Sequence, residues 1–263
     1  MEKKGEKPMG KIILVTGMLG NNSRGVPSFI LNTAYMNAIV AAGGVPVMMG
    51  STKLAAEYAE MADGLLITGG ESVHPSRFGD TFNNLADGDA NVAHNLKAGC
   101  NVIRDEMEFA AFEEFFKRKK PIMGICRGHQ LVNAALGGHN MLNFPRKHAV
   151  EHSEGIQHEI VAEDGSILNR LYGPKLLVNS FHRDCADAVG PDVKVTARSL
   201  DGIIEAIEHK TLPVFSVQFH PERMRGDAPN PAFGPDGTEL FKYFVEENER
   251  GYYVTVEFEE EEK

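Results

Sequence analysis

The sequence predicts an α/β protein built on a doubly wound, mostly parallel sheet with helices on both faces. Two observations support this prediction. Up to Gly138, short apolar runs of strand length alternate with longer segments whose apolar residues recur at helical spacing. Glycine pairs such as Gly43-Gly44 and Gly69-Gly70 end several of these segments, as expected where the chain changes direction.

Four strands and four helices are expected in this first part of the chain. The strands are Lys11–Thr16, Val45–Met49, Gly64–Thr68 and Pro121–Ile125, and the helices are Pro27–Ala42, Thr52–Met61, Arg104–Lys119 and Arg127–Leu136. Residues 71–101 lack sustained periodicity and are rich in Asn, Asp and Gly. A segment of this length inside a domain is usually functional or disordered, so residues 81–101 are expected to be either a lid that excludes water or a loose loop.

After Gly138 the pattern changes to short strand-like segments with few helices between them. These segments are Glu159–Ala162, Lys175–Asn179, Val193–Ala197, Ile203–Ile207 and Pro213–Phe219, and a final helix is expected at Gly237–Asn248. No internal repeat or linker divides the chain. We therefore expect a disordered leader at residues 1–10, one domain at 11–250 and a solvated acidic tail at 251–263.

Composition excludes several classes of partner. Apolar residues make up 42% of the chain and charged residues 24%, and 27 basic against 37 acidic residues give a net charge of −10. Nucleic acids and anionic membranes attract basic surfaces, so neither is expected as a partner. No apolar run reaches the ~18 residues of a membrane span, and the Lys-rich N-terminus lacks the apolar region of a secretory signal. A cytoplasmic protein is expected.

One of the three cysteines has the surroundings of a nucleophile. An odd number of widely spaced cysteines is not a disulfide framework. Cys126 lies in Gly124-Ile125-Cys126-Arg127-Gly128, between an expected strand and an expected helix. This is the cysteine counterpart of the G-x-S-x-G nucleophile elbow. The start of a helix favours the thiolate form, so Cys126 is predicted to be a catalytic nucleophile rather than a buried structural cysteine.

A thiol nucleophile needs a base and a group that orients the base. His220 and Glu222 follow the apolar run Pro213–Phe219 and are separated by Pro221. In an extended chain, residues i and i+2 point to the same side, so the Glu222 carboxylate is expected to hold the His220 imidazole. Active sites of parallel sheets lie at the carboxyl ends of strands, which is where both Cys126 and His220 are expected.

No metal and no cofactor are expected. His148 and His152 are four residues apart, a spacing that suits a metal on a helix, but no cysteine or third histidine completes a ligand set. His129 and His158 are interpreted as structural. Arg77, in the irregular segment, is a candidate partner for a substrate carboxylate.

These segments together resemble the class I glutamine amidotransferase-like superfamily. The resemblance is carried by PIMGICRGHQ, DGIIEAIE and VQFHPE, and further segments, among them LLITGGESVHPSRFG, RDEMEF and VNSFHRD, are similar to the γ-glutamyl-γ-aminobutyrate hydrolase group, also called peptidase C26. It covers residues 11–244. It implies a flavodoxin-like fold and a Cys–His–Glu triad of Cys126, His220 and Glu222.

The resemblance also implies roles for other residues. Backbone N–H groups of Gly70 and Arg127 would bind the oxyanion, and Gln130 would contact the substrate. His182 would also contact the substrate by lining the pocket, with a histidine in a surface turn as the alternative. A homodimer is a further expectation. The segments 139–156 and 183–185 depart from the family pattern, which leaves the leaving-group amine open.

Three functions remain open at this point. The first is a hydrolase that cleaves small γ-glutamyl amides through a thioester on Cys126, with a small γ-glutamyl amide as its only expected partner besides a second copy of the chain. The second is a glutaminase subunit that supplies ammonia to a separate synthetase. The third is a non-catalytic binding protein on the same fold.

Overall fold

A computed structural model describes residues 10–21, 23–144, 152–228 and 234–247. Its centre is one mixed sheet in the order β4-β1-β5-β6-β13-β12-β11-β8-β9. The first five strands of this order are parallel. They are β1 (Ile12–Val15), β4 (Val45–Met48), β5 (Gly64–Ile67), β6 (Ile122–Ile125) and β13 (Val214–Val217).

The sheet continues beyond β13 with antiparallel strands. Along the sheet these are β12 (Ile204–His209), β11 (Val193–Ser199), β8 (Ile156–Ala162) and β9 (Lys175–Ser180). Two short strands, β10 (Cys185–Ala188) and β7 (His139–Met141), pair with each other, and β10 also pairs with β12. The strands β7 and β10 were not predicted from the sequence.

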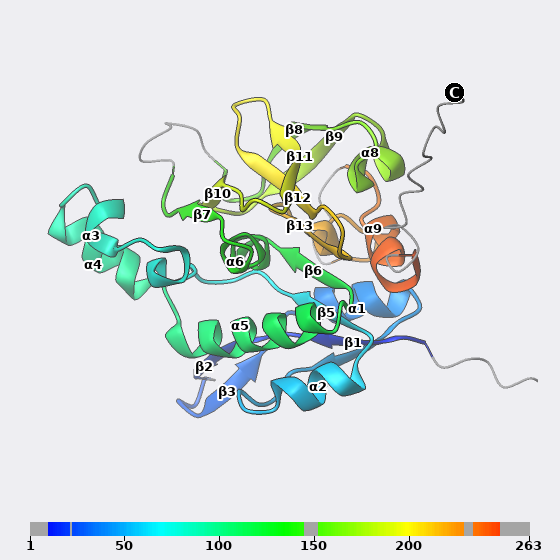
Figure 1. The fold of residues 1–263 in the computed structure, drawn as a ribbon, viewed down its shortest axis with the longest axis horizontal. Helices are drawn as coiled ribbons and strands as arrows, with labels where there is room; N and C mark the ends of the chain where they lie inside the picture. Colours follow the sequence, from blue (N-terminus) through cyan, green and yellow to red (C-terminus); the bar gives the residue numbers. More distant parts are fainter. Residues whose placement is uncertain (1–9, 22, 145–151, 229–233, 248–263) are drawn as a thin grey trace, which may run out of the picture.

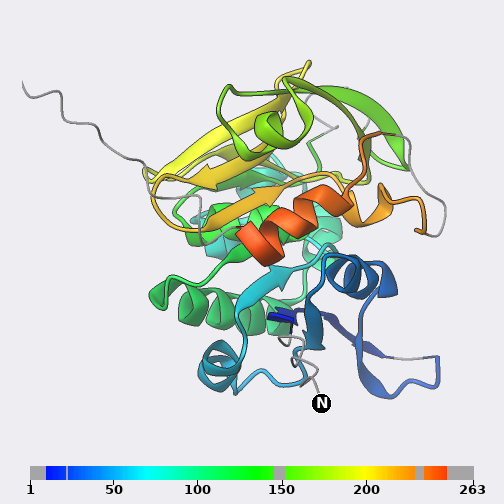
Figure 2. The ribbon, with the colours of Figure 1, turned by 90° about the vertical axis from the view of Figure 1, so that its right-hand side faces the viewer.

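Helices cover both faces of the sheet, as the sequence predicts (Figures 1 and 2). Alternate residues of β1 separate into two apolar cores, with Ile13 and Val15 on one side and Leu14 on the other, as the period of two in a strand requires. The first core receives α1 (Thr33–Ala41), α8 (Ile167–Tyr172) and α9 (Thr238–Lys242), and the second receives α2 (Ala55–Met61), α5 (Val102–Lys117) and α6 (Arg127–Ala135). Beyond α9 the chain continues as the π-helical turn η3 (Tyr243–Glu247).

The helix expected at Pro27–Ala42 is wrong in its first part. Residues 27–30 form β3 (Pro27–Ile30), which pairs with β2 (Met18–Asn21) in a separate antiparallel hairpin. Helix α1 begins only at Thr33, where the Asn32 side chain accepts a hydrogen bond from the Ala34 N–H. Asparagine is a strong helix N-cap, and this local signal separates the strand from the helix.

The irregular segment contains three short helical pieces. They are η1 (Pro75–Phe78), α3 (Phe82–Leu85) and α4 (Ala90–Ala98), and α3 and α4 extend away from the sheet at the left of Figure 1. Side chains of Thr81 and Asp89 cap the last two. Such short helices with little apolar periodicity leave no clear sequence pattern. The role of this segment as a lid stays a prediction.

The leader expected at residues 1–10, except Gly10, and the tail expected at 251–263 lie outside the described residues. No helix in the described part of the chain has the length and apolar character needed to cross a bilayer.

Candidate active site

Cys126 lies on a sharp turn between β6 and α6. Its backbone has φ 54° and ψ −107°, a conformation rarely adopted outside glycine and typical of a strained functional turn. The flanking glycines permit this turn because backbone lies against them: a Cβ on Gly124 would be 2.5 Å from the Gly128 carbonyl oxygen, and one on Gly128 would be 2.1 Å from that of Ile67. The elbow predicted from the sequence is therefore present.

His220 lies next to Cys126 because their strands are neighbours. Strands β6 and β13 pair in parallel, with Ile125 opposite Val217, so both strands end at the same edge of the sheet. The Cys126 side chain and the His220 imidazole lie beside each other, since a Cβ built on Gly69 would be 3.4 Å from the Cys126 Cβ and 3.0 Å from the His220 Cε1. Both side chains are buried. Two segments that are distant in the sequence thus meet at the carboxyl ends of adjacent parallel strands.

Glu222 contacts His220, but through a different local structure from the one expected. The His220 Nδ1 atom is 2.7 Å from the Glu222 Oε1 atom. The residues after His220 are not extended, however: Pro221–Arg223 forms the 3-10 turn η2. This turn, which proline begins readily because it has no N–H to satisfy, brings the carboxylate back to the imidazole. The pairing was predicted from an incorrect geometry.

The electrostatics of the three side chains favour a charged imidazole. Burial by itself would lower the pKa of His220, but the Glu222 carboxylate and Cys126 outweigh it and raise this pKa to about 10. An imidazolium carries a proton on each ring nitrogen. In this state Nδ1 donates to Glu222, which leaves the Nε2 proton available to Cys126 or to a substrate.

Two further side chains hold this group in place. Asn179, in β9, accepts from the His220 N–H at 2.9 Å and donates to the His220 carbonyl at 2.8 Å. The Tyr35 hydroxyl accepts from the Gly69 N–H at 3.0 Å and is 3.5 Å from His220 Nδ1. Burial and the nearby Glu222 and Cys126 raise the pKa of Tyr35 well above its usual value, which keeps the phenol neutral. Neither role was assigned from the sequence, although VNSFHRD contains Asn179.

The Gly69-Gly70 turn lies directly beside the nucleophile. A Cβ on Gly69 would be 3.4 Å from the Cys126 Cβ. The buried Arg104 guanidinium donates to the Gly69 carbonyl at 3.0 Å and pairs with Glu71 at 2.6 Å. The Gly69 carbonyl and the Gly70 N–H belong to one trans peptide unit, so they point in opposite directions. Because Arg104 binds the Gly69 carbonyl, the Gly70 N–H points away from Arg104.

Arg127 contributes its side chain to the buried charge network under this turn. Its guanidinium forms ion pairs with Asp105 and Glu108, both fully buried. Glu108 also pairs with Arg104 at 2.9 Å, so one network joins the elbow helix to the glycine turn. Arg127 is the first residue of α6, and the first N–H groups of a helix have no partner within the helix. Its backbone N–H therefore remains available for an anion.

Two residues predicted to contact the substrate are bound inside the protein. The Gln130 amide donates to the Asp184 carbonyl at 3.0 Å and to the Gln218 side chain at 3.3 Å. His182 is buried, with its Nδ1 3.0 Å from the Asp184 carbonyl, so the alternative of a surface turn is wrong. Contact of either residue with a substrate stays a prediction.

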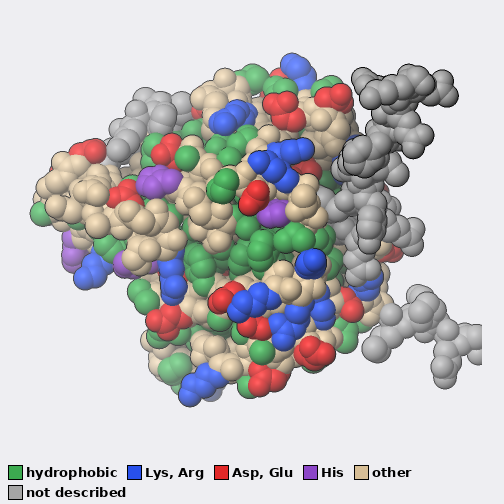
Figure 3. Space-filling model, viewed as in Figure 1, with side chains coloured by type: hydrophobic (Ala, Val, Ile, Leu, Met, Phe, Trp, Pro, Cys, Tyr) green, Lys and Arg blue, Asp and Glu red, His purple; other side chains and the backbone are tan. Residues whose placement is uncertain are grey.

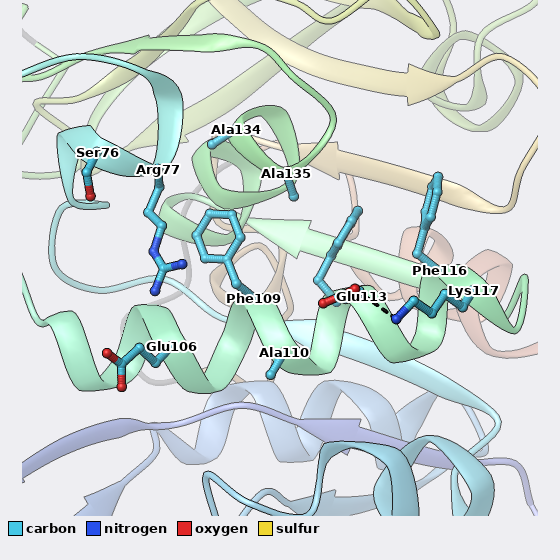
Figure 4. A pocket seen from close by; sticks show the side chains of 11 residues that line it. Ser76, Arg77, Glu106, Phe109, Ala110, Glu113, Phe116, Lys117, Ala134 and Ala135 are labelled. Carbon is cyan, nitrogen blue, oxygen red and sulfur yellow. Dashed lines mark ion pairs between the residues drawn. The ribbon is translucent and has the colours of Figure 1, made fainter.

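Two cavities differ in how they lie relative to Cys126, His220 and Glu222. One of about 730 Å³ lies between α5 and the end of α6, where Figure 3 shows hydrophobic side chains gathered and Figure 4 shows Arg77 above Phe109. None of the residues placed around Cys126 lines it. A second cavity of about 430 Å³ is lined by Ser72, which follows the glycine turn, and by Arg183 and Asp184. The second cavity is the better candidate for binding a substrate, although Arg77 does not line it.

Comparison with known proteins places this architecture in a family. The family model described as Peptidase C26 matches residues 12–222, which include the elbow, the glycine turn and the His220–Glu222 pair. The chain belongs to the Peptidase C26 family. The predicted superfamily resemblance is thereby confirmed.

Several known proteins are similar to this chain over most of their length. The γ-glutamyl-γ-aminobutyrate hydrolase PuuD of Escherichia coli is 30% identical, over 82% of this chain and 88% of its own. Protein NtpR of Enterococcus hirae is 30% identical, over 81% and 87%. A crystal structure from Thermoplasma acidophilum, named for a GMP synthase, has a TM-score of 0.58 at 16% identity, over 89% and 92% of the two chains. The last likeness concerns the fold alone.

Proposed function

We propose that the chain hydrolyses the γ-glutamyl amide bond of small γ-glutamyl conjugates and releases glutamate and an amine. The observation that carries this proposal is the contact of Cys126, His220 and Glu222 at the ends of two adjacent strands. Membership of Peptidase C26 and similarity to PuuD support a hydrolase. The leaving group suggested by the name of PuuD, γ-aminobutyrate, is the first one to test.

The first half-reaction forms a thioester. The Cys126 thiolate attacks the amide carbon, and the carbonyl electrons move onto oxygen to give a tetrahedral oxyanion. The Gly70 and Arg127 N–H groups stabilise this negative charge. The oxyanion collapses, the C–N bond breaks, and the His220 Nε2 proton is transferred to the departing nitrogen. The amine leaves and the glutamyl group stays on sulfur.

The second half-reaction releases glutamate. His220, now neutral, takes a proton from water, and the resulting hydroxide attacks the thioester carbon. The second tetrahedral oxyanion occupies the same N–H groups, the C–S bond breaks, and the thiolate is restored beside the imidazolium. Glu222 orients the His220 ring through Nδ1 in both steps and stabilises its positive charge. Asn179 holds the His220 backbone and Tyr35 holds the glycine turn.

The cavity near Ser72 suits the amino-acid end of such a substrate. Arg183 and Asp184 line it with opposite charges, and the glutamyl end carries an α-carboxylate and an α-ammonium group. Arg183 would pair with the carboxylate and Asp184 with the ammonium. A γ-linked substrate would then extend its side-chain carbonyl towards Cys126.

The test is a screen of γ-glutamyl conjugates with the purified protein. Glutamate release from γ-glutamyl-γ-aminobutyrate, γ-glutamyl polyamines, γ-glutamyl anilide and folate polyglutamates is measured with a coupled glutamate dehydrogenase assay. Cys126→Ala should abolish release. Cys100→Ala is the matched control, because burial raises the pKa of the Cys100 thiol to about 12 and Cys100 is not among the residues that line the cavity near Ser72. Full activity in Cys126→Ala would refute the mechanism.

The glutaminase alternative makes a different prediction in the same assay. If the chain supplied ammonia to a synthetase, glutamine would be its substrate and turnover would require a partner chain. Turnover of γ-glutamyl amides by the isolated chain, with glutamine poorly used, favours the hydrolase over this alternative. Failure of a thiol-directed γ-glutamyl probe to label Cys126 would instead favour a non-catalytic protein.

A further inference from the structure

Three buried side chains from separate segments converge at a point outside the catalytic group. His152 precedes β8, His182 follows β9, and Glu205 lies in β12, and they are exposed by 2%, 4% and 0%. The His152 Nδ1 and the His182 Nε2 are each 3.6 Å from the Glu205 Oε1. One ligand atom from each of the three residues lies within 4.8 Å of the other two.

The outer nitrogen of each histidine faces an acceptor. The His152 Nε2 is 3.0 Å from an Asp201 carboxylate oxygen, and the His182 Nδ1 is 3.0 Å from the Asp184 carbonyl. Since a carboxylate and a carbonyl can only accept, both outer nitrogens carry the proton. In a neutral imidazole the other nitrogen then has a free lone pair. Both of these inner nitrogens lie 3.6 Å from the same Glu205 oxygen.

The inner atoms have no hydrogen-bond partner among the residues that the structure describes. They are His152 Nδ1, His182 Nε2 and Glu205 Oε2. A buried polar atom without a partner costs about 1–3 kcal/mol. A cation bound between these atoms would give all three a partner.

We propose that His152, His182 and Glu205 form a binding site for a divalent transition-metal ion, with Zn²⁺ as the ion that fits best. Two imidazoles and one carboxylate are a common protein ligand set for zinc. At Zn–N and Zn–O lengths of about 2.0–2.1 Å, tetrahedral ligand atoms are about 3.3–3.4 Å apart. The observed nitrogen–oxygen separations of 3.6 Å need to shorten by a few tenths of an ångström, and the two histidine nitrogens, which lie within 4.8 Å of each other, would also have to come to this separation.

The surroundings of the three ligands match those of metal sites. Ligating histidines usually donate their other N–H to a carboxylate or a backbone carbonyl, as His152 and His182 do here. The ligating carboxylate is itself held, because the His158 Nε2 lies 3.2 Å from the Glu205 Oε1. A water molecule would complete the fourth position.

This proposal departs from the expectation of no metal. The pair considered in the sequence was His148 and His152, and His148 lies outside the described residues. The cluster joins three segments that are far apart along the chain, so no spacing pattern reveals it. Its consequence is structural: the metal would fix the segment from His182 to Asp184. Asp184 lines the cavity near the glycine turn and accepts a hydrogen bond from Gln130 in α6.

The experiment measures metal binding directly, independent of catalysis. Apoprotein prepared by dialysis against a chelator is titrated with Co²⁺, whose visible d–d bands report a low-coordinate site, and Zn²⁺ is then added to displace it. Full-length wild-type protein should bind one Co²⁺ per chain, lose the bands on addition of one Zn²⁺, and melt at a higher temperature with metal than without. Absence of Co²⁺ and Zn²⁺ uptake by wild-type protein would overturn the proposal.

Variants locate the ion within the chain. Glu205→Gln keeps the size of the side chain and removes its charge, and His182→Asn removes one nitrogen ligand; each should weaken binding by at least about tenfold. His94→Ala changes an exposed histidine on α4 and should bind normally. Cys126→Ala should also bind one ion, which separates this site from adventitious binding to the thiol. Loss of the ion in Cys126→Ala, with retention in Glu205→Gln and His182→Asn, would contradict the assignment.

Discussion

Gly70→Ala should remove most of the activity without unfolding the protein, because Gly70 supplies one of the two proposed oxyanion donors. A Cβ at this position would lie 2.0 Å from the Arg104 Nη1 atom, and the backbone has φ +152°. Ordinary contact requires about 3.4 Å or more, so the Gly69-Gly70 peptide must move by more than ~1 Å or Arg104 must leave its ion pair with Glu71. Either change misdirects the Gly70 N–H.

The expected cost follows from the loss of that donor. Removal of one oxyanion donor costs about 10²–10³ in kcat, or about 2.7–4 kcal/mol, with a smaller change in KM because the donor acts on the transition state. The assay is glutamate release under saturating γ-glutamyl substrate. Gly79→Ala is the control, since Gly79 also has positive φ, +76°, but has open space around it. It should lose stability, by about 1–2 kcal/mol, and keep its kcat. A folded Gly70→Ala protein with wild-type kcat would refute the oxyanion assignment.

Three other variants test the group around the imidazole. Glu222→Gln should lower kcat roughly a hundredfold or more and shift the upper pH limit of activity downward. The pKa of His220 is raised to about 10, so its contribution to stability is complete below the unfolded pKa of about 6.5 and is lost as pH rises through about 10. Urea unfolding of wild type and Glu222→Gln across this window should therefore show the difference between their free energies of unfolding shrinking as pH rises. A difference that stays constant would contradict the raised pKa. Asn179→Ala removes two hydrogen bonds to the His220 backbone and should cost about 1–3 kcal/mol of stability with at least a tenfold loss of kcat. An unchanged kcat would show that these two hydrogen bonds are not needed for catalysis. Tyr35→Phe leaves the Gly69 N–H without its acceptor and should lower kcat about tenfold with little change in KM, whereas a change in KM alone would assign Tyr35 to substrate binding.

The central part of the site was predictable because its signals are local. The glycines around Cys126 and the apolar runs before Cys126 and His220 are visible in the sequence, and parallel strands bring their carboxyl ends together. The pairing of His220 with Glu222 was predicted for the wrong reason, since a 3-10 turn rather than an extended chain joins them. The residue types were sufficient to predict the His220–Glu222 pair, but they did not predict the backbone conformation that joins the two residues.

Features built from distant segments were not predictable. Arg104 has the pattern of a polar position on a helix, yet it is fully buried and holds the carbonyl of Gly69. His182 has the pattern of a turn residue, yet it packs in a buried cluster with Glu205. The apolar residues from Pro27 onward recur at helical spacing, so the sequence predicts a helix that begins at Pro27 in spite of the N-cap residue Asn32. In the structure, Pro27–Ile30 forms a strand and the helix begins after Asn32. Tertiary context decides each of these cases.

The most direct test of the proposed mechanism is the mass of the protein during turnover. The reaction with a γ-glutamyl anilide is quenched in acid within the first turnover. A thioester accumulates at this stage if it forms faster than it hydrolyses. The intact protein and its peptides are then analysed by mass spectrometry. The proposed mechanism predicts an increase equal to one glutamyl group, located on Cys126 and removed by hydroxylamine. Glutamate release at the normal rate with no adduct on Cys126, under conditions where amine release shows a burst, would contradict it.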